Sequence, residues 1–161
     1  NYFYSPLTDK LELLGTDTRR QTNLDGFLRM TADQQGKAMK HVPLKMIENG
    51  HIAVTVKESI LEKAFDLGEK FVAQCKKLPK ELDPSGKGMI GPFALQGAVV
   101  AEEGREEIVI FDVSFRIPGS PGTFATPYSR YLYGQSMSVG ERIAMELRLA
   151  VESDGVEKVI T

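Results

Sequence analysis

Two apolar, β-rich runs in the second half of the chain constrain the fold most. They cover residues 89–100 and 108–117, and the polar residues 102–105 separate them. A glycine in a short polar connection between two such runs is typical of a β-hairpin. The sequence therefore predicts two antiparallel strands that fold about Gly104.

Two helices are predicted from apolar residues that recur every three or four positions. The first begins at Ser59 and continues to Cys75, and Ser59 forms a capping box with Glu62. The second begins at Ser138, which forms a capping box with Glu141. The core face of this last helix is expected to carry Ile143, Leu147, Ala150 and Val151.

Shorter elements precede the first helix. Strands are predicted at residues 11–14, 16–22, 27–30 and 52–56, with turns at 23–26 and 49–50, and residues 31–40 are expected to be a loop or a short helix. The order strands, helix, hairpin, helix predicts an α+β fold, a mostly antiparallel sheet with helices packed on one face.

Composition indicates one globular domain and excludes several classes of function. The chain has 161 residues, 42% of them hydrophobic, which is enough to bury a core. Its 20 basic and 22 acidic residues leave it nearly neutral, so neither nucleic acid nor an anionic membrane is an expected partner. The single cysteine, Cys75, excludes a disulfide framework within the chain and fits a reducing cytoplasm. Because the chain begins with Asn1 and already in a strand, we expect a fragment of a longer protein.

Polar side chains interrupt the second run of the hairpin. Strict alternation places Asp112, Ser114 and Arg116 on one face, whereas the opposite face of that run is wholly apolar. If the hairpin folds about Gly104, Gln96 lies opposite Asp112. Carboxylate and amide oxygens on adjacent strands suit Mg²⁺. From alternation alone, a surface pair of Asp112 with Arg116 on a solvated sheet face is the favoured alternative.

Eight short motifs occur in the order in which they are found in one known family. They are NYFYSP at 1–6, LLG at 13–15, TNLDG at 22–26, KES at 57–59, IGPFALQ at 90–96, FDVSFR at 111–116, PYS at 127–129 and MSVGERIA at 137–144. Along essentially its whole length the chain resembles the C-terminal part of the PurP family of archaeal ATP-grasp ligases.

The resemblance implies an activity in purine biosynthesis, on the path to IMP. PurP-like enzymes use ATP and Mg²⁺ to join formate, through formyl phosphate, to the amine of 5-aminoimidazole-4-carboxamide ribonucleotide. Residues 1–161 are then the C-terminal half of an ATP-grasp fold whose N-terminal part is absent, so the isolated chain is expected to be inactive. A homo-oligomer is also expected.

The resemblance also assigns site residues. Gln96 and Asp112 occupy the two metal positions, Gln21 a position that contacts ATP, and His51 a position that contacts the ribonucleotide. The catalytic candidates are Ser114 and Arg116, from the polar face of the same strand.

Three of these positions depart from the family pattern, which has glutamate at 21 and 112 and asparagine at 51. Asp112 has a shorter reach, Gln21 lacks a charge, and His51 differs in size and titrates near neutral pH. One alternative is therefore a non-catalytic or substrate-altered PurP paralogue that binds nucleotide. Another is an ATP-grasp ligase for a different carboxylate or amine.

Overall fold

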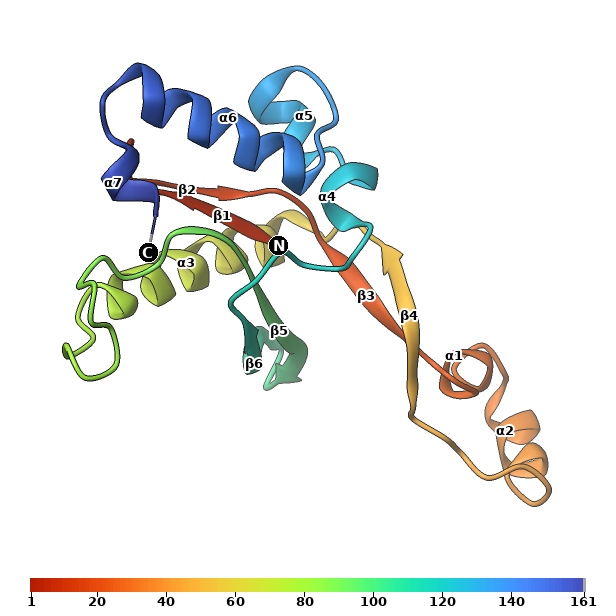
Figure 1. Ribbon diagram of the computed structural model, residues 1–161. Helices are drawn as coiled ribbons and strands as arrows, with labels where there is room; N and C mark the ends of the chain where they lie inside the picture. Colours follow the sequence, from red (N-terminus) through yellow and green to blue (C-terminus); the bar gives the residue numbers. More distant parts are fainter. Residues whose placement is uncertain (161) are drawn as a thin grey trace.

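Two antiparallel sheets organise the chain (Figure 1). The computed structural model describes residues 1–160. The larger sheet has four strands in the order β2-β1-β5-β6, and β3 and β4 form a separate two-stranded ribbon. In chain order the elements are β1 (Tyr2–Ser5), β2 (Lys10–Leu13), β3 (Asp17–Gln21), α1 (Leu24–Phe27), α2 (Ala32–Ala38), β4 (Glu48–Ala53), α3 (Glu58–Cys75), β5 (Gly91–Glu102), β6 (Arg105–Ser114), α4 (Gly122–Ala125), α5 (Tyr128–Tyr133), α6 (Val139–Glu152) and α7 (Val156–Val159).

Helices cover both faces of the four-stranded sheet, because alternate residues of β1 face different helices. Tyr2 and Tyr4 belong to the apolar core that α3 completes, and the Tyr2 hydroxyl donates to the carbonyl of Ala64 on α3. Phe3 and Ser5 face α6 instead, where the Ser5 hydroxyl donates to Glu146 at 2.6 Å. The predicted α+β class with an antiparallel sheet is confirmed, but the helices expected on one face lie on two.

A buried ionic network joins α6 to the sheet. The Arg142 guanidinium donates twice to Glu12 on β2, at 2.7 and 2.9 Å, and once to Glu146, at 2.9 Å. It also lies 3.9 Å from the centre of the Phe3 ring. Burial alone would lower the pKa of Arg142, but the hydrogen bonds and charge of Glu12 outweigh it and raise that pKa above its ordinary value.

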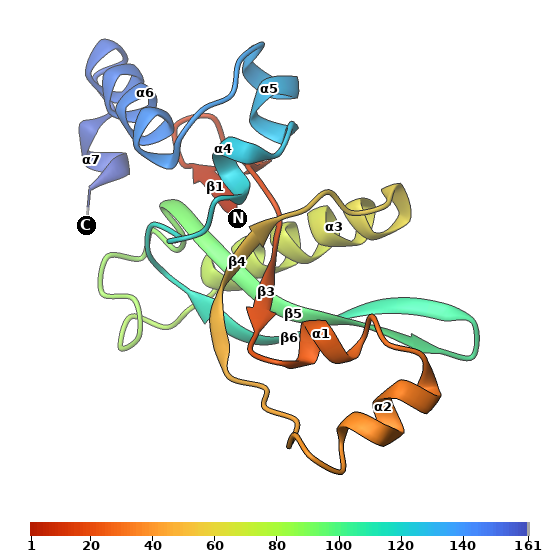
Figure 2. The same ribbon diagram turned by 90° about the vertical axis from the view of Figure 1, so that its right-hand side faces the viewer.

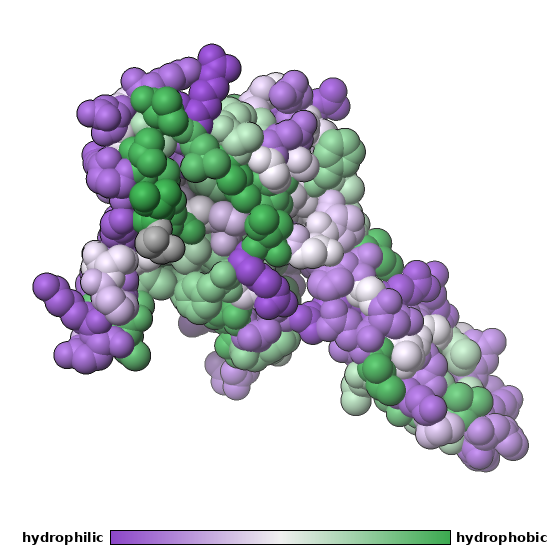
Figure 3. Space-filling model, in the orientation of Figure 1, coloured by the Kyte–Doolittle hydropathy of each residue, from purple (hydrophilic) through white to green (hydrophobic). Residues whose placement is uncertain are grey.

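The face of α6 that packs on the sheet is not the predicted one. Of the four residues expected in the core only Ala150 is fully buried, whereas Leu147 and Val151 are exposed. The buried positions also include Arg142 and Glu146, whose partners lie on β1 and β2. Apolar side chains therefore gather on the outer surface over α6 (Figure 3).

The ribbon β3–β4, with α1 and α2 at its end, projects from the rest of the molecule (Figures 1 and 2). Its base is fixed at Gly15, which touches the start of α4. A Cβ atom at Gly15 would lie 2.3 Å from the backbone carbon of Gly122 and 2.4 Å from the nitrogen of Thr123. The two backbones can approach this closely only because both facing residues are glycines.

The Gly15→Ala variant is expected to lose about 1–3 kcal/mol of unfolding free energy, the usual cost of overpacking a contact that cannot yield easily. Chemical denaturation of the variant and the unaltered protein measures the loss. The control is Gly119→Ala on the segment between β6 and α4, where an added Cβ meets nothing within 4 Å. Equal stability of the two variants would show that the Gly15 contact is not tight in solution.

Several local predictions are confirmed and others are wrong. The hairpin folds at Glu103 and Gly104, and Ser138 and Glu141 form the predicted capping box. The capping box predicted at Ser59 is wrong, because α3 begins at Glu58 after Lys57, whose side chain makes no capping hydrogen bond. The turn and strand predicted at 23–30 are replaced by α1, and the predicted turn at 49–50 lies inside β4, next to a register shift of the ribbon.

Candidate functional site

A cleft of about 870 Å³ lies between the β3–β4 ribbon and the β5–β6 hairpin. The inner side of the ribbon forms one wall, the hairpin forms the other, and residues 118–120 after the hairpin close one end. α3 contributes Ile60, Ala64 and Leu67 to the floor. The cleft therefore has apolar side chains on its floor and along much of the hairpin, and its charged side chains lie mainly on the ribbon. Small-molecule sites commonly combine an apolar lining with a few polar groups in this way.

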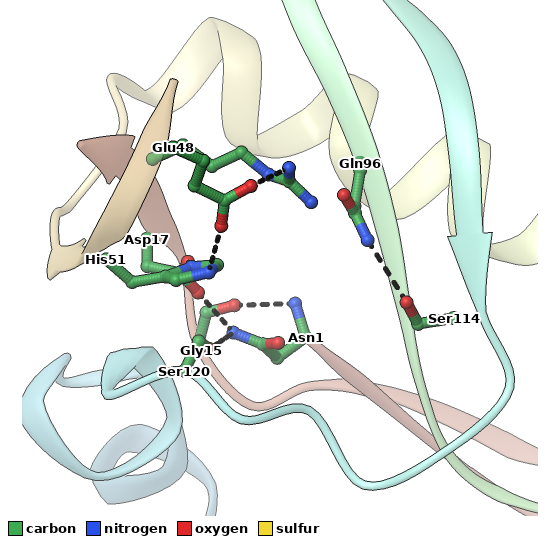
Figure 4. Close-up of polar contacts among 9 residues, drawn as sticks. Asn1, Gly15, Asp17, Glu48, His51, Gln96, Ser114 and Ser120 are labelled. Atoms are coloured by element: carbon green, nitrogen blue, oxygen red, sulfur yellow. Dashed lines mark hydrogen bonds and ion pairs between the residues drawn. The ribbon is translucent and has the colours of Figure 1, made fainter. Parts of the chain in front are cut away.

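The hairpin wall carries the predicted metal pair. Gln96 lies opposite Asp112 in the ladder, so the predicted register is confirmed. Gln96 lines the cleft, and its Nε2 donates to the Ser114 hydroxyl at 3.0 Å (Figure 4). Its Oε1 is buried and has no hydrogen-bond partner among the described residues. A buried acceptor without a partner is costly, so Oε1 is available to accept a hydrogen bond or to coordinate a ligand.

Asp112 is placed differently from Gln96. Its side chain is exposed and is not among the residues that line the cleft. One carboxylate oxygen, Oδ1, accepts a hydrogen bond from the backbone nitrogen of Val113 at 2.9 Å. The pair is thus adjacent on the two strands, but only Gln96 already faces the cleft.

A β-bulge next to this pair explains the difference. The ladder shifts register between Gln96 and Gly97, so Phe111 is an extra residue on β6. Gly97 fits because a Cβ there would lie 2.6 Å from the carbonyl oxygen of Val109. The strict alternation expected along β6 is therefore wrong across the bulge. The side chains expected on its apolar face are largely exposed at Val109, Phe111, Phe115 and Ile117.

The ribbon wall holds a chain of charged side chains. His51 Nδ1 lies 2.5 Å from Asp17, and His51 Nε2 lies 2.9 Å from Glu48 (Figure 4). Glu48 in turn pairs with Arg19. Gln21 follows two residues after Arg19 on the same side of β3 and also lines the cleft.

Asp17 connects this wall to the end of the cleft. Asn1 Nδ2 donates to Asp17 and to the Ser120 hydroxyl, each at 2.8 Å. Burial raises the pKa of the Asp17 carboxyl, but hydrogen bonds from Ser120, His51 and Asn1 outweigh it and hold that pKa below its usual range. Asp17 is therefore a carboxylate at neutral pH and fixes the first position of the chain.

The structure brings five of the six predicted site residues to one cleft. Gln96, Ser114 and Arg116 come from the hairpin side, and Gln21 and His51 come from the ribbon; Asp112 is the exception. Sequence reasoning missed Asp17 and Glu48. Alternation along β3, which puts positions 17, 19 and 21 on one side, was the signal that could have found Asp17 beside Gln21.

Membrane-spanning helices and clusters of metal-binding side chains are both absent from the described part of the chain, residues 1–160. Within residues 1–160, no helix is long and apolar enough to cross a bilayer. Over the same range, no three His, Cys, Asp or Glu side chains are close enough to hold a metal ion together.

The fold is shared with a solved protein of the PurP type. The crystal structure of an IMP biosynthesis protein PurP from Thermococcus kodakaraensis matches with a TM-score of 0.69 and 35% sequence identity, over 99% of this chain and 47% of that one. The chain thus has the fold of a part of PurP, as the motifs predicted.

The chain belongs to the family described as domain of unknown function DUF1297, whose model matches residues 1–161. It is 39% identical to 5-formaminoimidazole-4-carboxamide-1-(beta)-D-ribofuranosyl 5'-monophosphate synthetases of Methanococcus maripaludis and Methanocaldococcus jannaschii. It is also 39% identical to the synthetase of that name from Methanobrevibacter smithii. In each case all of this chain is matched, but it spans only 42% of the length of the relative.

Proposed function

We propose that this chain is the C-terminal, nucleotide-binding part of a longer ATP-grasp ligase of purine biosynthesis. The ligase joins formate to the amine of 5-aminoimidazole-4-carboxamide ribonucleotide and uses ATP. The observation that carries the proposal is the buried oxygen of Gln96, which has no hydrogen-bond partner among residues 1–160, in a cleft that four other predicted site residues also line. The names of the relatives supply the product, the formamido ribonucleotide, and the resemblance to PurP supplies formate, the amine and ATP.

The residues present fit Mg²⁺ bound together with a nucleotide. Gln96 Oε1 is a free oxygen acceptor, and Asp112 Oδ2 has no hydrogen bond among residues 1–160. Two protein oxygens suffice for this ion, because Mg²⁺ usually takes its other ligands from phosphates and water. When bound, it would neutralise charge on the terminal phosphates. Asp112 would have to turn its carboxylate toward Gln96.

The chemistry consists of two substitutions. A formate oxygen attacks the γ-phosphorus of ATP, which forms formyl phosphate and releases ADP. The amine nitrogen then attacks the formyl carbon, phosphate leaves, and the amine loses a proton. Arg116 offers a guanidinium at the cleft to offset phosphate charge. The Ser114 hydroxyl accepts from Gln96 and keeps its own hydrogen to donate to substrate.

Exposed apolar surface supports a larger protein. Phe111, Phe115 and Ile117 are each more than half exposed, next to the cleft, and further apolar residues lie on the outer face of α6. Exposed apolar side chains that gather on a surface in this way often mark an interface. We assign the missing part of the ligase, or a second copy in a homo-oligomer, to this surface.

The test uses the full-length protein with formate, ATP and the ribonucleotide. The formamido ribonucleotide, ADP and phosphate are expected in equal amounts, and the isolated 161 residues are expected to give none. Phosphate release by the isolated chain would refute its assignment as an incomplete part. Absence of product from the full-length protein would refute the ligase.

A second candidate, a ligase with another acid or amine, is favoured by His51. Both of its ring nitrogens are engaged by carboxylates, at a position where the PurP pattern has asparagine. Phosphate release measured with a panel of small carboxylic acids separates the two. If an acid other than formate alone supports release, the formate assignment fails and the ligase class survives.

A further inference from the structure

The charged residues of the ribbon wall form one chain that starts near the body of the molecule and ends at Arg19. Exposure of the side chains rises along it, from 11% at Asp17 through 30% at His51 and 34% at Glu48 to 37% at Arg19. Each member contacts the next, and Arg19 is the most exposed of these four cleft-lining side chains.

The hydrogen-bonding capacity of His51 is already used. Both ring nitrogens face carboxylate oxygens, Nδ1 toward Asp17 and Nε2 toward Glu48. A ligand could reach a ring nitrogen only by displacing one of these carboxylates. His51 is therefore better placed to hold Glu48 than to bind ligand through a ring nitrogen.

Most N–H donors of the Arg19 guanidinium make no hydrogen bond within residues 1–160. Its guanidinium uses Nη1 on Glu48, and no other hydrogen bond from it is found among residues 1–160. A guanidinium has five N–H donors in a planar fork that matches a phosphate. A carboxylate that already holds the guanidinium in place reduces the conformational entropy that the arginine side chain loses when it binds a phosphate.

We infer that Arg19 binds a phosphate group of the nucleotide ligand, and that Glu48 and His51 are positioning residues for it. The inference rests on the proposed function, because it takes the ligand to be a nucleotide. The phosphate comes either from ATP or from the ribonucleotide: Gln21, the predicted ATP contact, and His51, the predicted ribonucleotide contact, both neighbour Arg19. The competing view is that Arg19 and Glu48 form an ordinary surface pair, which contributes little.

The experiment is a calorimetric titration of the full-length protein with ATP, with the ribonucleotide, and with the matching ribosides that lack phosphate. Arg19→Met is expected to weaken binding of one of the two nucleotides by about 10- to 100-fold, the range for a charged hydrogen-bonded contact. Riboside binding is expected to stay unchanged. Whichever nucleotide is affected identifies the source of the phosphate.

Arg20→Met is the matched control. Arg20 neighbours Arg19 on β3 but is not among the cleft residues, and its contact is a 3.5 Å pair with Asp25. Its Kd for both nucleotides is expected to remain within about twofold of the unaltered protein. If Arg19→Met and Arg20→Met weakened nucleotide binding equally, Arg19 would contribute only positive charge and no specific phosphate contact, which would overturn the inference.

Glu48→Gln tests the positioning role, because glutamine keeps the size of the side chain and removes its charge. Affinity for the affected nucleotide is expected to fall about threefold to tenfold, with the riboside unaffected, as a partial loss of the Arg19 contact requires. Equal weakening of nucleotide and riboside would indicate a structural role for Glu48 and contradict positioning.

The remaining outcomes separate this inference from the proposed function. Nucleotide binding that Arg19→Met leaves unchanged refutes the role of Arg19 and leaves the ligase standing. Binding that depends on Arg19 but yields no product refutes the ligase and supports the role of Arg19. Failure of the unaltered protein to bind either nucleotide refutes both.

Discussion

Replacing Arg142 by methionine is expected to lower the free energy of unfolding by about 3–5 kcal/mol, the usual cost of removing one partner from a buried ion pair. Among residues 1–160, the change leaves the Glu146 carboxylate, 3% exposed, with only the Ser5 hydroxyl as partner, and it leaves Glu12 without its two charged hydrogen bonds. Methionine keeps most of the side-chain volume over Phe3, so the lost unfolding free energy comes from the missing charge and hydrogen bonds rather than from lost packing. Urea denaturation of the variant and the unaltered protein measures it.

The same helix provides a matched control. Arg148 pairs with Glu152 four residues later, as Arg142 does with Glu146, but it is 82% exposed. Arg148→Met is expected to change stability by no more than about 0.5 kcal/mol. If both variants lost the same small amount of unfolding free energy, the ionic network between α6 and the sheet would stabilise the protein no more than a surface ion pair does.

The Gln96→Leu variant of the full-length protein is expected to lose activity with little loss of stability. Leucine is similar in size but offers no oxygen to a metal and no donor to Ser114. The Mg²⁺ concentration for half-maximal rate is expected to rise about 10- to 100-fold, the scale on which residues around metal sites act. Steady-state rates over a Mg²⁺ titration measure the shift.

Gln74→Leu, on the exposed side of α3 and outside the cleft, serves as the control for Gln96. Asp112→Asn is expected to raise the Mg²⁺ requirement in the same direction, because an amide oxygen attracts the ion less than a carboxylate does. An Asp112→Asn variant with an unchanged Mg²⁺ requirement would mean that Asp112 stays turned away from the cleft during the reaction.

Local signals in the sequence were sufficient for the hairpin and for the start of α6. Gly104 lies between two long apolar runs, and the capping box of Ser138 and Glu141 involves residues only three positions apart. The same signal was present at Thr31 and Gln34, which form the capping box of α2, in a stretch predicted only as a loop or a short helix.

Features that depend on distant partners could not be predicted. Arg142 and Glu146 appear on a helical pattern as solvent-facing residues, and only Glu12 and Ser5, more than 120 residues earlier, make their burial possible. The bulge at Phe111 interrupts an alternation that is continuous in the sequence. Nothing in the sequence therefore indicated that Asp112 would lie outside the cleft that Gln96 lines. The cleft itself was anticipated only through the resemblance, which supplied Gln21 and His51 on a ribbon far from the hairpin in the chain.

We expect the cleft between ribbon and hairpin to hold a metal-bound nucleotide, with Gln96 as a protein ligand. A crystal structure of the full-length protein with a non-hydrolysable ATP analogue and Mn²⁺ in place of Mg²⁺ would show this, because the anomalous signal locates the ion. The prediction is a Mn²⁺ peak roughly 2.0–2.2 Å from Gln96 Oε1, close to Mg–oxygen bond lengths, with Asp112 turned toward it. A nucleotide and metal bound outside this cleft would contradict the claim.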